Sequence, residues 1–219
     1  MAETVVIVAA GPGLGRSVAR RFAREGADVA LVARSAERLE PLVAELVALG
    51  VRAHAVAADV ADEASLRSGL EDVRRVQGDP GVLVYNASEY VEGRPTSVGY
   101  PQFVHGLLVG VGGALVAAQE VAPAMRAAGR GTVLLTGSEA AIRPSVGAAG
   151  LGVAKAGLRN LAFSLAADLG PDGVHVTTVT IRGVLKVGTP FDPDVIAEHY
   201  WRLHVQPPQE WQPEFVLSK

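Results

Sequence analysis

Residues 4–34 read TVVIVAAGPGLGRSVARRFAREGADVALVAR, and the rest of the chain is predicted to pack around the unit that they form. The β-branched apolar run Thr4–Ala10 has the length of a strand and leads directly into a glycine turn. From Leu14 onward apolar residues recur at helical spacing, and Gly26 ends the predicted helix. Asp28–Ala33 is typical of a second buried strand. The stretch therefore predicts a strand, a turn, a helix and a second strand.

The predicted turn carries three glycines, Gly11, Gly13 and Gly15, and Leu14 starts the helix. Glycines at such a turn let the backbone come close to a pyrophosphate, and the unpaired N–H groups of a helix N-terminus favour an anion. A glycine pattern alone is weak, but this one follows a strand and opens a helix. We therefore expect a dinucleotide at this turn, the alternative being a tight turn that binds no ligand.

The end of the second strand distinguishes between the two nicotinamide dinucleotides. NAD-binding units place an acidic residue about twenty residues past the glycines, where it accepts from the ribose 2′-hydroxyl, whereas a nearby Arg can hold a 2′-phosphate. Here that point carries Ala33, Arg34 and Ser35, so a guanidinium is present and no carboxylate repels a phosphate. The sequence favours NADP(H) over NAD(H), the alternative for Arg34 being a solvated residue at the start of the next helix.

Composition limits the kinds of partner that the chain can have. Of its 219 residues 49% are hydrophobic, and no Pro-, Gly- or Ser-rich linker interrupts them, so we expect a single domain over residues 1–219. The net charge of -3 and the scattered Lys and Arg residues argue against nucleic-acid binding. With no Cys, and five His that lack metal-ligand spacing, neither a disulfide nor a metal site is expected.

Two observations concern the membrane. The first predicted strand begins within a few residues of Met1, which leaves no room for a signal peptide. The longest apolar stretch, Gly106–Ala118, is too short to span a bilayer. We expect a soluble cytoplasmic protein without a membrane partner.

Strands and helices alternate to the end of the chain. Further strands are predicted at 51–58, 82–85, 132–136, 174–181 and 214–217, and helices at 36–49, 62–77, 101–128, 147–169 and 194–203. Such alternation predicts a single-domain Rossmann-type α/β fold, a doubly wound, mostly parallel sheet of about seven strands with helices on both faces. Ligands bind beyond the carboxyl ends of the strands in such sheets. That edge is predicted to bring together the glycine turn, Arg34, Asp59, Asn86, Ser138 and Gly183.

Short motifs recur along the chain at Ala9–Arg16, Ala58–Val60, Tyr85–Ser88, Pro123–Met125, Thr136–Ser138, Lys155 and Arg182–Gly183. Through them the chain resembles the short-chain dehydrogenase/reductase family over nearly its whole length. The resemblance implies an oxidoreductase of the carbonyl reductase or alcohol dehydrogenase type, with a small carbonyl or alcohol substrate. It also implies that Asp59 and Val60 border the adenine. In the same way it implies that Asn86, Ala87 and Gly183 contact the cofactor.

The catalytic tetrad of that family is incomplete in this sequence. The tetrad consists of Asn, Ser, Tyr and Lys, with Tyr four residues before Lys and Ser about thirteen residues before Tyr. Counting back from Lys155 places Leu151 at the tyrosine position and Ser138 at the serine position. Counting from the Pro123 motif places Gly110 at the asparagine position. The resemblance is therefore to a divergent subgroup that lacks the catalytic tyrosine.

In the family mechanism the tyrosine protonates the carbonyl oxygen, the lysine holds the ribose hydroxyls and the serine donates to the carbonyl. The resemblance implies that Lys155 remains a ribose clamp and that Ser138 donates to substrate, the alternatives being a surface lysine and a strand-end cap. Loss of a positioned acid costs about 10² to 10⁴ in rate but leaves cofactor binding intact. Replacement acids are sought among four side chains that also have structural explanations: Tyr85, Tyr90, Tyr100 and His105.

The sequence leaves the function open between two main possibilities. The first is an NADP(H)-dependent reductase or dehydrogenase of atypical mechanism, and the second is a catalytically weakened NADP(H)-binding sensor or partner subunit. A third and weaker possibility is non-redox proton chemistry at Ser138 and Lys155. The resemblance also implies a short substrate lid at about 184–205, and a homodimer or homotetramer formed through the two long helices.

Overall fold

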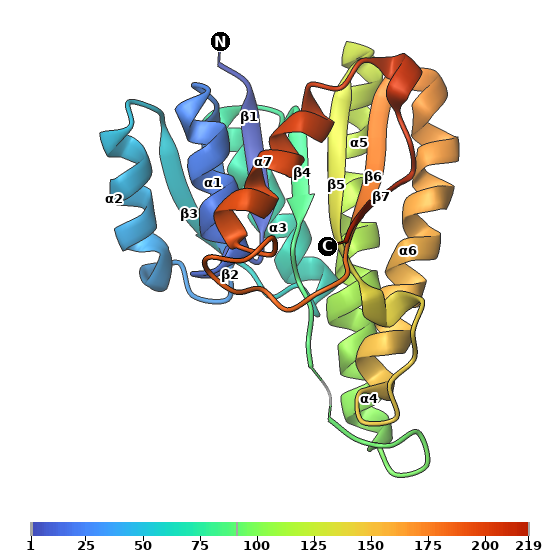
Figure 1. Cartoon of the computed structure of the whole chain (residues 1–219). Coiled ribbons are helices and arrows are strands. Elements are labelled where there is room, and N and C mark those ends of the chain that lie inside the picture. The colour runs from blue at the N-terminus through green and yellow to red at the C-terminus, as the bar shows by residue number, and fades with distance from the viewer. Residues whose placement is uncertain (1, 91, 219) are drawn as a thin grey trace.

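Strand β1, Thr4–Val8, is an inner strand of a seven-stranded sheet in the computed structural model, which describes residues 2–90 and 92–218 (Figure 1). The strand order is β3-β2-β1-β4-β5-β6-β7, and every neighbouring pair runs parallel. Helices cover both faces (Figure 1). The predicted fold class is therefore confirmed.

The other strands are β2 Asp28–Ala33, β3 Ala53–Ala57, β4 Val82–Tyr85, β5 Gly131–Ser138, β6 Val174–Ile181 and β7 Glu214–Leu217. Strand β1 ends two residues earlier than predicted, because Ala9 has a positive φ of 63° and turns the chain out of the sheet. Strand β5 runs two residues further than predicted, because Gly137 and Ser138 pair with the end of β6.

The helices are α1 Leu14–Arg24, α2 Glu40–Ala48, α3 Glu63–Gln77, α4 Tyr100–Leu107, α5 Gly113–Ala128, α6 Ala149–Leu169 and α7 Pro193–His204. A 3-10 turn, Glu37–Leu39, replaces the first turn of the helix that was predicted at 36–49. Asp62 caps α3, because its carboxylate accepts from the backbone N–H of Ser65 at 2.9 Å.

Alternate side chains of β1 enter two separate cores. Val5 and Ile7 pack against α1, α2 and α7, while Val6 and Val8 pack against α3, α5 and α6. All four side chains are fully buried. The strands in the middle of the sheet are therefore apolar on both faces, which is typical of a parallel sheet between two helical layers.

Helix α7 occupies most of the segment that the sequence analysis assigned to a lid. Four of its side chains, Ile196, Ala197, Tyr200 and Leu203, are buried in the core shared with α1. The Tyr200 hydroxyl lies 2.7 Å from that of Thr136 on β5. A lid over the edge of the sheet can therefore include only the loop at 182–192.

The helix that was predicted as one piece at 101–128 has three parts. A π-helical segment, Leu108–Gly112, separates α4 from α5. It widens the helix where Tyr85 approaches, and the Tyr85 hydroxyl donates to the Val109 carbonyl at 2.5 Å. A Cβ on Gly113 would overlap that hydroxyl and would lie 2.6 Å from the Val60 carbonyl. This glycine is therefore required by close packing.

The continuous stretch Tyr100–Ala128 is long and apolar enough to cross a membrane by length and composition alone, with a mean hydropathy of 1.5. The sequence analysis had counted only the uninterrupted apolar run within it. The core helix of a globular protein can meet the same criterion, and α5 packs against α3 and α6 in this fold.

Candidate functional site

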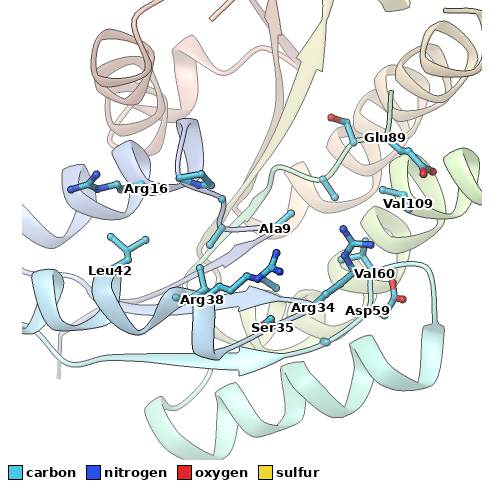
Figure 2. Close-up of a pocket in the computed structure, with 18 of the residues that line it drawn as sticks. Ala9, Arg16, Arg34, Ser35, Arg38, Leu42, Asp59, Val60, Glu89 and Val109 are labelled. Atoms are coloured by element: carbon cyan, nitrogen blue, oxygen red, sulfur yellow. The ribbon is translucent and has the colours of Figure 1, made fainter. Parts of the chain in front are cut away.

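A cleft of about 760 Å³ opens at the carboxyl ends of β1 to β4 (Figure 2). Its walls come from the glycine turn, the ends of β2 and β3, the segment after β4, and the helices α2 and α4. Six of the residues predicted to bind cofactor line it: Gly11, Arg34, Ser35, Asp59, Val60 and Ala87. The switch of strand order between β1 and β4 places the cleft where ligands bind in such sheets.

The glycine turn forms one wall of the cleft. A Cβ on Gly11 or Gly13 would meet nothing within 4 Å, so these positions leave space beside the backbone. A Cβ on Gly15 would lie 2.9 Å from the Cα of Ala10, so this glycine lets α1 pack directly on the turn. Leu14 is buried beneath it. Because the first turn of α1 carries no acidic residue, its free N–H groups offer an uncompensated positive end.

Three guanidinium groups reach the cleft, from Arg16, Arg34 and Arg38. Arg16 is paired with Glu45, whose carboxylate accepts from its Nε and Nη2 at 3.1 and 2.9 Å. Within residues 2–90 and 92–218, Arg34 and Arg38 have no carboxylate within 4.0 Å. Their side chains point into the same space (Figure 2). The cleft therefore holds two uncompensated positive charges at the end of β2. Arg38, four residues after Arg34 in the 3-10 turn Glu37–Leu39, was not predicted from the sequence.

Asp59 and Asn86 have structural partners as well as positions at the strand edge. The Asp59 carboxylate accepts from the Ala61 N–H at 2.9 Å, which shapes the turn after β3. The Asn86 side chain donates to the Ala9 carbonyl at 3.2 Å and so ties β4 to the glycine turn. Asn86 does not line the cleft but supports the glycine turn through this hydrogen bond, while Ala87 lines the cleft.

Ser138, Lys155 and Gly183 are at the same edge of the sheet but do not line the cleft. The Ser138 hydroxyl accepts from the Ala140 N–H at 3.2 Å, which is the capping role that the sequence analysis gave as an alternative. Gly183 lies against the ring of Phe191, which a Cβ would overlap. The loop at 182–192 is thereby folded onto the end of β6.

Lys155 is buried, with 4% of its surface exposed, so the alternative of a surface lysine is wrong. Its ammonium donates to the Thr136 carbonyl at 2.6 Å. Burial lowers the pKa of Lys155 from 10.5 to about 8. Within the described residues this carbonyl is its only hydrogen-bond partner, so two of its three donor positions are free.

The two positions where the sequence predicts substituted tetrad residues differ in kind. Leu151 on α6 has no proton to give. Gly110 lies in the π-helical segment, and a Cβ there would lie 2.9 Å from the Cβ of Ala154 on α6. An asparagine would therefore require α6 to shift, so the substitution to glycine is coupled to the packing of the two long helices.

Only one of the four replacement acids lies in the cleft. Tyr85 is fully buried, where desolvation raises the pKa of its hydroxyl, and it does not line the cleft. Tyr90 and Tyr100 are 67% and 77% exposed and do not line the cleft. His105 lines it, and its Nδ1 lies 2.7 Å from Oε2 of Glu89. The sequence analysis did not find Glu89, because its partner is 16 residues away.

Among the residues that the structure describes, no group of three or more His, Asp or Glu side chains could hold a metal ion. The functional groups at this edge include two guanidiniums without a carboxylate partner, a buried lysine, a serine and a carboxylate–imidazole pair.

Comparisons with known proteins identify relatives of the chain. A family model described as short chain dehydrogenase matches residues 3–191. The chain is 33% identical over 180 residues to a serine 3-dehydrogenase of Agrobacterium fabrum, covering 82% of this chain and 71% of that protein.

Solved structures superpose over nearly the whole chain. A short-chain dehydrogenase from Rhodopseudomonas palustris has a TM-score of 0.90 at 30% identity, with 99% of this chain and 98% of that chain covered. A metagenomic short-chain oxidoreductase in complex with NADP has a TM-score of 0.90 at 28% identity, with 98% and 96% covered.

Proposed function

The chain belongs to the short-chain dehydrogenase family, and on that premise we propose that it is an NADP(H)-dependent oxidoreductase that interconverts a small carbonyl compound and its alcohol. The observation that carries the choice of cofactor is the pair Arg34 and Arg38, which place two unpaired guanidiniums in the cleft where β2 ends. A 2′-phosphate would supply the missing negative charge. The NADP complex of the metagenomic relative supports the same choice.

The residues present fit a phosphorylated dinucleotide. Gly11 and the positive end of α1 leave room and partial charge for a diphosphate, and Asp59, Val60 and Ala87 provide the wall along which the adenosine half would lie. When bound, the nicotinamide would supply hydride chemistry. The two free donor positions of Lys155 suit the hydroxyls of the adjacent ribose.

The proposed mechanism is atypical because Leu151 cannot protonate a carbonyl oxygen. The Ser138 hydroxyl accepts from the Ala140 N–H, and its own hydrogen can be donated to a substrate oxygen, since a hydroxyl both donates and accepts. A donor aimed at a developing oxyanion is worth about 10² to 10³ in rate. We assign this role to Ser138 and the clamping of the cofactor to Lys155, and the chain then lies in a divergent subgroup without the tyrosine.

A panel of small aldehydes and ketones tests the proposal, with oxidation of NADPH followed by absorbance. A Ser138→Ala variant is expected to lose about 100-fold in kcat while the Kd of NADPH stays within about twofold, because only the contact to substrate is removed. Ser164→Ala, on the exposed face of α6, is the matched control and should keep wild-type rates.

Leu151 favours a second candidate, a weakened NADP(H)-binding sensor or partner subunit. Wild-type protein that binds NADPH but turns over no member of the panel would support this candidate and contradict the oxidoreductase. Conversion of substrate without consumption of cofactor would point instead to proton chemistry at Ser138 and Lys155.

We also propose that the chain assembles into a homodimer or homotetramer through its long helices. These helices expose apolar side chains at Leu108, Leu115, Val153 and Phe163. Covering such side chains is favourable by about 25 cal/mol per Å² of buried apolar surface. Light scattering should give two or four times the 22.7 kDa mass of one chain, and a monomer at micromolar concentration would contradict the proposal.

A further inference from the structure

Glu89 and His105 form a carboxylate–imidazole pair at one end of the cofactor cleft. The Oε2 atom of Glu89 lies 2.7 Å from Nδ1 of His105, and both side chains line the cleft. Their side chains are 40% and 48% exposed, so neither is sealed in the core. Figure 2 shows Glu89 beside Val109, at the end of the cleft opposite Arg16.

The geometry of this pair leaves the second ring nitrogen of His105 available. Within residues 2–90 and 92–218, Nε2 of His105 has no hydrogen-bond partner. A carboxylate at Nδ1 fixes the orientation and the tautomer of an imidazole, and the protonated ring presents an N–H at Nε2. The same ring in its neutral form can accept a proton there.

The position of His105 in the chain is five residues before Gly110. Val109 follows His105 by four residues and lines the same cleft. Gly110, at the position that corresponds to the family asparagine, is the next residue. His105 thus lies about one helical turn from that position, on the face of the helix that borders the cleft.

We propose that His105 is the acid and base that replaces the missing tyrosine, and that Glu89 is its positioning residue. This inference depends on the oxidoreductase activity proposed above. In reduction, a bound reduced nicotinamide would supply the hydride to the carbonyl carbon, and the π-electron pair of the carbonyl would move to its oxygen. The oxygen takes the proton from Nε2 as that N–H bond breaks, which leaves a neutral imidazole that regains a proton from solvent. In alcohol oxidation the same bonds form and break in reverse.

The kinetic test uses full-length protein with NADPH and a carbonyl substrate of the wild type. His105→Asn is expected to lower kcat by about 100-fold, within the range for a lost general acid, while the Kd of NADPH changes by less than about twofold. Glu89→Gln should lower kcat by about 10-fold because it replaces the carboxylate that orients the ring through Nδ1. His199→Asn, on α7 and away from the cleft, is the matched control.

Two further measurements separate proton transfer from a structural role. Added imidazole should raise the kcat of His105→Gly at least about 10-fold, because free imidazole can enter the space that the side chain leaves. In protein without cofactor, long-range ¹H–¹⁵N spectra should show a proton on Nδ1 of His105 that shifts on Glu89→Gln. The second measurement needs no turnover and no substitution at His105.

Three results would overturn the inference. The first is a kcat of His105→Asn within twofold of the wild-type value. The second is a set of His105 resonances that do not change on Glu89→Gln. Either result would leave the oxidoreductase proposal intact. Wild-type protein that reduces no carbonyl would overturn both proposals together.

Discussion

Between pH 7 and pH 10.5, the wild-type protein without cofactor should gain about 3 kcal/mol of unfolding free energy relative to a Lys155→Met variant. Burial lowers the pKa of Lys155 from 10.5 to about 8. In that window the unfolded chain binds more protons than the folded one, so the stability of the wild type rises with pH. A difference of about 2.5 pKa units corresponds to about 3 kcal/mol.

The sign of this effect follows from which form burial penalises. Below about pH 8 the folded protein carries a buried ammonium, whose burial is unfavourable, and the methionine variant does not. The variant also leaves the Thr136 carbonyl without its donor, which costs about 1 to 3 kcal/mol at every pH. The pH-dependent part of the difference is therefore the quantity to measure.

Urea unfolding of both proteins at several pH values measures it directly. Lys186→Met, in the exposed loop at 182–192, is the matched control and should follow the wild type at every pH. If the unfolding free energies of wild type and Lys155→Met changed in parallel with pH, burial of a charged Lys155 in the folded protein would be contradicted. With NADPH present, the same variant should bind about 10-fold more weakly, because charge-assisted hydrogen bonds to the ribose are lost.

The second large effect concerns the choice of cofactor. Arg34→Ala is expected to weaken NADPH binding by about 100-fold and NADH binding by less than about threefold. A charged hydrogen bond is worth about 1.5 to 3 kcal/mol, and only NADPH carries the phosphate that would receive it. Arg38→Ala should have the same direction and a smaller effect, about 10-fold.

Fluorescence titration of the variants with NADPH and NADH measures this selectivity. Arg20→Ala is the matched control, because Arg20 is paired with Glu45 at 2.9 Å and does not line the cleft. An equal loss of affinity for both cofactors would contradict a phosphate contact and would indicate a general effect of charge or folding.

Periodicity predicted the elements of the fold well, because each depends on residues that are close in the chain. β2, β4, β6 and β7 have the predicted ends, since apolar runs and turn residues mark both sides of them. The end of β1 was predicted two residues too late because Ala9 has a positive φ, which an alanine rarely adopts. The π-helical segment arises from contact with Tyr85, a residue 24 positions before Val109.

The residues that line the cleft were more predictable at the proposed cofactor end than at the proposed catalytic end. Gly11, Arg34 and Asp59 each follow directly from a strand end, so topology alone brings them together. The orientation of the Tyr85 side chain and the burial of Lys155 depend on contacts with residues that are distant in the chain. Local sequence patterns therefore do not predict them. The pair formed by Glu89 and His105 depends on how the segment after β4 folds back on α4.

Calorimetric titration of the wild-type protein with NADPH tests the central claim that the cleft at β1 to β4 binds a phosphorylated nicotinamide dinucleotide. We predict saturable heat at one site per chain, with NADPH bound at least about 10-fold more tightly than NADH, as expected for one or two charge-assisted contacts to the additional phosphate. No heat with either dinucleotide, reduced or oxidised, would contradict the account.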